Sequence, residues 1–219
     1  MEAIAKALVK VLKPQPRKVL DIGCAKGFLV KAFQDMGIDA IGVDISSYAI
    51  KHGICSNLIL ADATNLCFKS NTFDLVVSIH TIEHLRNPEK LIAEARRVLK
   101  PGGYLFIVTP TPEGDKKRKI PDPTHVSVYS EKKWMTFFNG FERLKDKERE
   151  IARIYTINLA KAHAKMYANK APTSFIGKIL NIIKIRQFVI TLYLFFYISF
   201  IDLKRQYFFL FRKTDKDKN

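Results

Sequence analysis

Two histidines and a glutamate lie within five residues of one another, at His80, Glu83 and His84, and another histidine follows at His125. Histidine readily exchanges a proton near neutral pH, so each of these residues is a candidate general base for an acceptor hydroxyl or ammonium group. The same four side chains also form a ligand set for a divalent metal ion. We favour the interpretation without a metal, in which Glu83 and His84 begin or cap a helix and line a pocket.

Acidic residues and glycines lie in and after several short apolar runs. Gly23 and Gly27 allow a sharp backbone turn and a close approach to a ligand. Asp44 can accept hydrogen bonds from two ribose hydroxyls, and Asp62 can accept one from an exocyclic amine such as that of adenine. Asp21 would repel a pyrophosphate but attract an ammonium group, which favours S-adenosylmethionine over a dinucleotide.

Apolar runs alternate with helical patterns along the first two-thirds of the chain. We expect strands at residues 18–22, 40–43, 58–60, 73–78 and 104–108, and helices at residues 2–12, 28–37 and 88–99. Strands that alternate with helices form a parallel sheet with helices on both faces, and ligands bind outside the carboxyl ends of its strands. The candidate side chains at these strand ends should therefore share one edge of the sheet.

Residues 19–28, 42–46, 61–63, 73–78, 83–85 and 98–103 carry an ordered set of motifs. This set resembles class I S-adenosylmethionine-dependent methyltransferases, in the small-molecule branch often called methyltransferase type 11, over about residues 17–145. The resemblance implies an α/β fold with a Rossmann-like doubly wound, mostly parallel seven-stranded sheet. Its sixth strand is expected at about residues 141–149 and its antiparallel last strand at residues 206–211. The resemblance also implies that S-adenosyl-L-methionine is the cofactor and is held by residues of these motifs, namely Asp21, Gly23, Cys24, Gly27, Asp44, Ile45, Asp62, Ala63 and Ser78.

The sequence departs from related patterns in three places. Ala25 stands where the family often has glycine. Metal-dependent small-RNA 2′-O-methyltransferases have a similar Glu-x-x-Glu-His motif followed by a histidine, but here His80 occupies the first position. Enzymes that methylate adenine or cytosine amines have an Asn/Asp-Pro-Pro-aromatic tetrapeptide after the fourth strand, where this chain reads Ser78-Ile79-His80-Thr81. An oxygen, carbon or other small-molecule acceptor is therefore expected.

The 219 residues carry a formal net charge of +16, and most of the excess lies in the C-terminal half. The three cysteines and the lack of an apolar signal segment at the N-terminus predict a cytoplasmic protein. We expect a methyltransferase core at residues 1–150, a helical insertion before the last strand at 151–203, that strand at 204–213, and a disordered tail at 214–219. Residues 161–213 hold ten basic side chains and one acid in an apolar stretch, which is typical of contact with an anionic membrane surface.

Residues 188–201 of the insertion form an uncharged apolar segment. A helix of that length reaches about 21 Å, which is short of the ~30 Å hydrocarbon core and disfavours a single crossing. We expect the segment to lie in the membrane interface, with a re-entrant hairpin, a lid over the pocket or a dimer surface as the alternatives. The predicted function is methylation of a hydrophobic or lipid-like small molecule at a membrane surface.

Two other functions stay open. One is an RNA methyltransferase that uses the basic C-terminal half, and the other is a non-catalytic, cofactor-binding partner protein at a membrane. Single-stranded RNA favours basic residues interleaved with exposed aromatics, whereas the aromatics of residues 188–201 form an unbroken apolar block. Nucleic acid is therefore the less expected partner, and the sequence does not indicate an oligomeric state.

Overall fold

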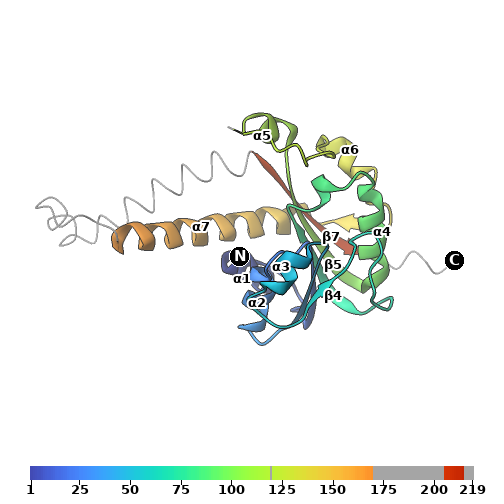
Figure 1. The fold of residues 1–219 in the computed structure, drawn as a ribbon, viewed down its shortest axis with the longest axis horizontal. Helices are drawn as coiled ribbons and strands as arrows, with labels where there is room; N and C mark the ends of the chain where they lie inside the picture. Colours follow the sequence, from blue (N-terminus) through green and yellow to red (C-terminus); the bar gives the residue numbers. More distant parts are fainter. Residues whose placement is uncertain (119, 170–204, 215–219) are drawn as a thin grey trace, which may run out of the picture.

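The computed structural model describes residues 1–118, 120–169 and 205–214 (Figure 1). Its sheet consists of β1 (Lys18–Ile22), β2 (Asp39–Asp44), β3 (Leu58–Leu60), β4 (Phe73–Ile79), β5 (Leu99–Pro110), β6 (Phe141–Arg143) and β7 (Gln206–Lys213). The helices are α1 (Glu2–Val11), α2 (Phe28–Gln34), α3 (Ser47–Lys51), α4 (Pro88–Val98), α5 (Pro112–Lys116), α6 (Glu131–Met135) and α7 (Lys145–Asn169), with a 3₁₀ turn η1 (Ile82–His84).

The seven strands form one sheet in the order β3-β2-β1-β4-β5-β7-β6. The first five strands of the chain pair in parallel, and β7 runs antiparallel between β5 and β6. The predicted fold class is confirmed, including the antiparallel last strand. Because Ile22 at the end of β1 is in register with Val43 of β2 and Ser78 of β4, the carboxyl ends of these strands meet at one edge.

Two apolar clusters fill the two faces of the sheet. Val19 belongs to the cluster beneath α1, α2 and the start of α7, whereas Leu20 and Ile22 belong to the cluster beneath α4 and α6. This division follows from the strand geometry, since successive side chains point to opposite faces. Trp134 of α6 is fully buried in the second cluster, so this aromatic side chain stabilises the core.

The sixth strand is shorter than the sequence pattern indicates. We expected it at about residues 141–149, but β6 ends at Arg143, and α7 begins at Lys145 and runs across residue 150 to Asn169. A tertiary contact favours the early start of the helix. Glu148 in its first turn is buried and accepts hydrogen bonds from the Leu210 backbone N–H (2.8 Å) and from Arg143 Nε (2.9 Å). These bonds hold α7 against β7.

Helix α7 packs against α1 and β7 near its start and then projects beyond α1 (Figure 1). Within the described ranges, no helix is both long enough and apolar enough to span a bilayer. The predicted last strand is confirmed at Gln206–Lys213. The apolar segment at residues 188–201 and almost all of the predicted tail lie outside the described residues.

Candidate active site

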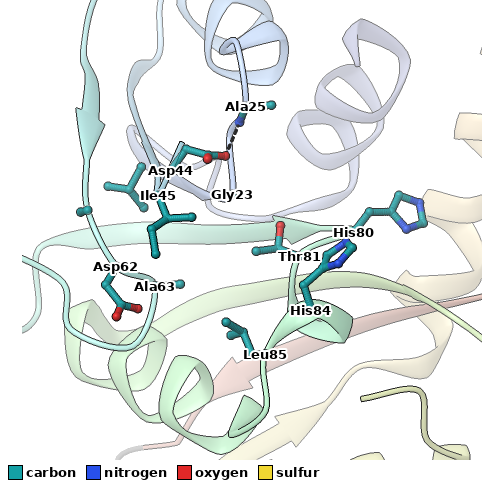
Figure 2. A pocket seen from close by; sticks show the side chains of 12 residues that line it. Gly23, Ala25, Asp44, Ile45, Asp62, Ala63, His80, Thr81, His84 and Leu85 are labelled. Atoms are coloured by element: carbon teal, nitrogen blue, oxygen red, sulfur yellow. Dashed lines mark hydrogen bonds between the residues drawn. The ribbon is translucent and has the colours of Figure 1, made fainter. Parts of the chain in front are cut away.

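A cavity of about 430 Å³ opens at the carboxyl edge of the sheet (Figure 2). It brings together seven residues predicted from the sequence: Gly23, Asp44, Ile45, Asp62, Ala63, His80 and His84. Its other lining residues are Ala25, Val43, Ala61, Thr81 and Leu85. The carboxyl ends of the strands therefore lie together, as predicted, and their residues line one cavity.

The first loop of the site is held by the carboxylate of Asp44. Asp44 Oδ2 accepts a hydrogen bond from the Ala25 backbone N–H, and Asp44 Oδ1 accepts one from the Ser46 backbone N–H, both at 2.8 Å. Each carboxylate oxygen has more than one acceptor position, so both can still accept a ribose hydroxyl. The loop itself adopts left-handed backbone at Gly23 (φ 79°) and Ala25 (φ 47°).

Cys24 and Gly27 belong to the same loop but do not line the cavity. Cys24 is buried beside Gly42, and burial, followed by the nearby charges of Asp21 and Asp44, raises the pKa of its thiol well above the usual range. Gly27 caps α2 in a left-handed conformation, where a Cβ would come within 2.8 Å of Cys55 Sγ. Both residues therefore shape the loop through packing and backbone geometry.

Asp21 and Ser78 lie on adjacent strands and are absent from the lining of the cavity. Ser78 is fully buried, and its Oγ has no hydrogen-bond partner among the described residues. Asp21 is 4% exposed, and burial, assisted by repulsion from Asp44, raises the pKa of its carboxyl to about 7. A positively charged group placed beside Asp21 would reverse part of this shift, since an opposite charge favours the carboxylate.

We therefore expect affinity for S-adenosylmethionine to increase with pH up to about 7. Below that pH the Asp21 carboxyl of the free protein is mostly protonated, and an ammonium group that binds beside it must displace the proton. The affinity should change by up to about tenfold per pH unit below 7 and level off above it, because one proton is linked to binding. Calorimetric titrations of the native chain and Asp21→Asn across this range measure the effect. An equally steep pH dependence in Asp21→Asn would contradict it.

The two ends of the cavity differ in chemistry. Asp62 and Ile45 lie at one end in Figure 2, and His80 and His84 lie at the other. Asp62 Oδ1 accepts hydrogen bonds from the Thr64 backbone N–H (2.7 Å) and Thr64 Oγ1 (2.8 Å), and these bonds hold the pKa of Asp62 below its ordinary value. Its other oxygen is the natural acceptor for an exocyclic amine. The Asp62 end therefore fits the base of a nucleoside, and the histidine end fits the acceptor.

Glu83 connects the histidine end of the cavity to the segment that contains His125. It is fully buried, and its Oε1 lies 3.1 Å from His80 Nδ1. Its backbone oxygen accepts hydrogen bonds from the N–H groups of Val126 and Ser127, at 3.0 and 2.9 Å. These bonds bring the segment that contains His125 back onto η1.

His84 and His125 meet edge to face, with ring centroids 4.9 Å apart. His84 Nδ1 lies 2.8 Å from Thr124 Oγ1, and His125 Nδ1 lies 2.6 Å from Asp115 Oδ1. His80 and His84 therefore line the cavity, whereas Glu83 and His125 contact them from outside its lining. The expectation that Glu83 lines the pocket is wrong, because its side chain is fully buried.

Thr81, Asp115 and Thr124 were not predicted as site residues, because their positions depend on loop conformation. Leu85 stands in the motif at residues 83–85, but that motif did not assign it to the cavity.

Comparison with known proteins identifies the family. Residues 1–142 match the family described as "Methyltransferase domain". Norajmaline N-methyltransferase of Rauvolfia serpentina is 36% identical over 106 residues, which cover 43% of this chain and 36% of that protein. Ubiquinone biosynthesis O-methyltransferase of Paraburkholderia phymatum is 28% identical over 102 residues, which cover 42% of this chain and 44% of that protein. The matches span less than half the length of these relatives.

Solved structures agree on the fold. A SAM-dependent methyltransferase from Aquifex aeolicus superposes with a TM-score of 0.53 at 21% identity, over 64% of this chain and 80% of that one. The [4+2]-cyclase SpnF superposes with a TM-score of 0.59 at 18% identity, over 97% of this chain and 81% of that one. Since one fold hosts several chemistries, the structural likeness alone defines only the architecture. The family match extends over most of the described sheet and includes Asp21, Asp44 and Asp62. Because of this match, the chain belongs to the class I S-adenosylmethionine-dependent methyltransferases of the small-molecule type.

Proposed function

We propose that this protein transfers a methyl group from S-adenosylmethionine to a hydrophobic or lipid-like small molecule at a membrane surface. The observation that carries the proposal is the polarity of the cavity. Asp44 and Asp62 line its nucleoside end, and four candidate bases lie at or beside its other end. When bound, S-adenosylmethionine supplies the methyl group, and the protein's own task is to place the acceptor opposite the sulfur and to take its proton.

The histidine end suits an acceptor that loses a proton. His80 and His84 line the cavity, and the imidazole of His84 is supported by Thr124 and the ring of His125. Leu85 adds an apolar wall beside them. A hydroxyl held against these side chains has a base within reach, while an apolar body of the acceptor can pack on Leu85.

Two lines of support favour a hydrophobic acceptor. Several relatives carry names that refer to ubiquinone biosynthesis or demethylmenaquinone. The uncharged run at residues 188–201 is bracketed by Lys184, Arg186, Lys204 and Arg205. Apolar segments with basic flanks bind the headgroup region of anionic membranes. A cytoplasmic enzyme that meets its substrate at a membrane accounts for both features.

Flotation of the full chain with vesicles tests the membrane part of the proposal. We expect binding to anionic vesicles that persists at high salt, because apolar insertion is not screened by ions. Phe195→Asp should abolish the salt-resistant binding. Phe28→Asp, which places the same change at a half-exposed phenylalanine of α2, is the matched control and should bind like the native chain. Binding that disappears at high salt would contradict apolar insertion and direct the substrate search to soluble acceptors and RNA.

A further inference from the structure

Three side chains at the acceptor end form a compact group of ligand atoms. Glu83, His84 and His125 each offer one such atom, and the three atoms lie within 4.8 Å of one another. They come from two separate segments, η1 and the stretch before α6, which the backbone bonds of Glu83 hold together. His80 contributes to this group only through its 3.1 Å contact with Glu83.

The hydrogen bonds at Nδ1 of the two histidines indicate the same tautomer for both rings. Asp115 Oδ1 is a carboxylate oxygen 2.6 Å from His125 Nδ1, so this nitrogen carries the proton and Nε2 keeps its lone pair. The Thr124 backbone oxygen, 3.2 Å from His84 Nδ1, can only accept a hydrogen bond, which assigns the same tautomer to His84. Both Nε2 atoms are therefore set up as electron-pair donors.

Such support by oxygen atoms is characteristic of histidines that bind metal ions. A ligating histidine donates its other N–H to a carboxylate or carbonyl, which fixes the ring and strengthens the ligand. Here Asp115 supports His125 and Thr124 supports His84. The carboxylate of Glu83 is fully buried, so an added cation would also offset the cost of burying its charge.

The charged groups around the cluster are compatible with a cation. Asp122 Oδ2 lies 3.4 Å from His125 Nε2 and adds a second carboxylate beside the first. Arg118 NH1 lies 3.4 Å from Nδ1 and 3.1 Å from Nε2 of His125. Because the shorter contact is a hydrogen bond to Nε2, a cation at this nitrogen must displace the Arg118 guanidinium. The Arg118 side chain is 42% exposed and pairs with Asp115 at 4.0 Å and with Asp122 at 3.4 Å.

We propose that Glu83, His84 and His125 bind one divalent cation, with Asp115 and Thr124 as positioning residues. Two histidines and a carboxylate suit Zn²⁺, Mn²⁺ or Fe²⁺ and leave open positions for a further ligand. The group borders the cavity at His84, so an acceptor hydroxyl placed there can coordinate the ion, which lowers the pKa of that hydroxyl. This role rests on the proposed function, whereas binding of the ion does not.

Metal titration of the full chain tests the site without any substrate. After removal of metals with a chelator, Co²⁺ is added and followed by its visible absorption, and Mn²⁺ and Zn²⁺ are followed by calorimetry. We expect one ion per chain with an absorption spectrum of nitrogen and oxygen ligands. His84→Ala and His125→Ala should each weaken binding by at least about tenfold, and Asp115→Asn by roughly tenfold, as for other residues that support a metal ligand.

The control is His52→Ala, because His52 caps the C-terminus of α3, contacts Tyr48 and does not belong to the cluster. It should bind the ion like the native chain. Absence of one-to-one binding, or unchanged affinity in the His84→Ala/His125→Ala double variant, would overturn the proposal. Binding of S-adenosylmethionine, measured on the same samples, shows whether each variant is folded. If the native chain binds S-adenosylmethionine but no metal ion, the proposed metal site is wrong, and the proposed methyl transfer is not affected.

Discussion

Replacing Asp44 with alanine should abolish measurable binding of S-adenosylmethionine. The carboxylate lines the nucleoside end of the cavity and also holds the first loop through the backbone N–H groups of Ala25 and Ser46. Two hydrogen bonds from ribose hydroxyls to a charged acceptor contribute roughly 3 to 6 kcal/mol, so their loss weakens binding by more than about 100-fold. Isothermal titration calorimetry measures the change directly.

Two further variants separate the causes of this loss. Asp44→Asn keeps one acceptor oxygen and should bind with intermediate affinity. Asp39→Ala changes an aspartate on the same strand that is half-exposed and pairs with Lys18, away from the cavity. We expect this variant to bind like the native chain. Native affinity in Asp44→Ala would show that the nucleoside lies elsewhere.

Gly23→Ala should both destabilise the fold and prevent cofactor binding. Gly23 has φ 79°, and an added Cβ would lie 2.0 Å from Thr81 Oγ1. The left-handed backbone costs an alanine about 1 to 2 kcal/mol. The contact with Thr81 adds to this cost, because Thr81 is held by a 3.2 Å hydrogen bond to the Ile22 carbonyl. The loop that contains Gly23 must therefore move, which changes the shape of the cavity that it lines.

Gly37→Ala is the matched control for Gly23→Ala. Gly37 has almost the same φ, 75°, but a Cβ there would meet no atom within 4 Å. In this variant the free energy of unfolding should fall only by the about 1 to 2 kcal/mol that left-handed backbone costs an alanine, and the affinity for the cofactor should not change. Urea denaturation gives the two free energies of unfolding, and calorimetry gives the affinities. Equal losses of stability in the two variants would show that the Thr81 contact relaxes without cost.

The parallel part of the fold could be predicted because its strands are short apolar runs that end in glycine or polar residues. Predicted residues 58–60 and 73–78 match β3 and β4 within one residue. The end of β6 could not be predicted, because α7 begins where Glu148 meets the backbone of β7. That contact joins segments that are distant in the sequence, and local periodicity carries no information about it.

The same distinction applies to the site. Asp44 and Asp62 could be placed at the cavity because they follow strands whose ends share an edge. The motif that includes Cys24 identifies the loop but not the direction of each side chain, and Cys24 packs beside Gly42. The support of His125 by Asp115 depends on the fold of the segment between β5 and α6, which has no periodic pattern to reveal it.

The position of β7 in the sheet has a consequence for synthesis of the protein. β7 pairs with β5 from Gln206 to Arg212 and is the only described strand that pairs with β6. During translation the N-terminal elements emerge first, so β5 keeps an open, apolar edge until β7 has left the ribosome. Such an edge is a template for pairing with another chain. Chains that stop before Gln206 are therefore prone to aggregate, and the sheet closes only after β7 has emerged.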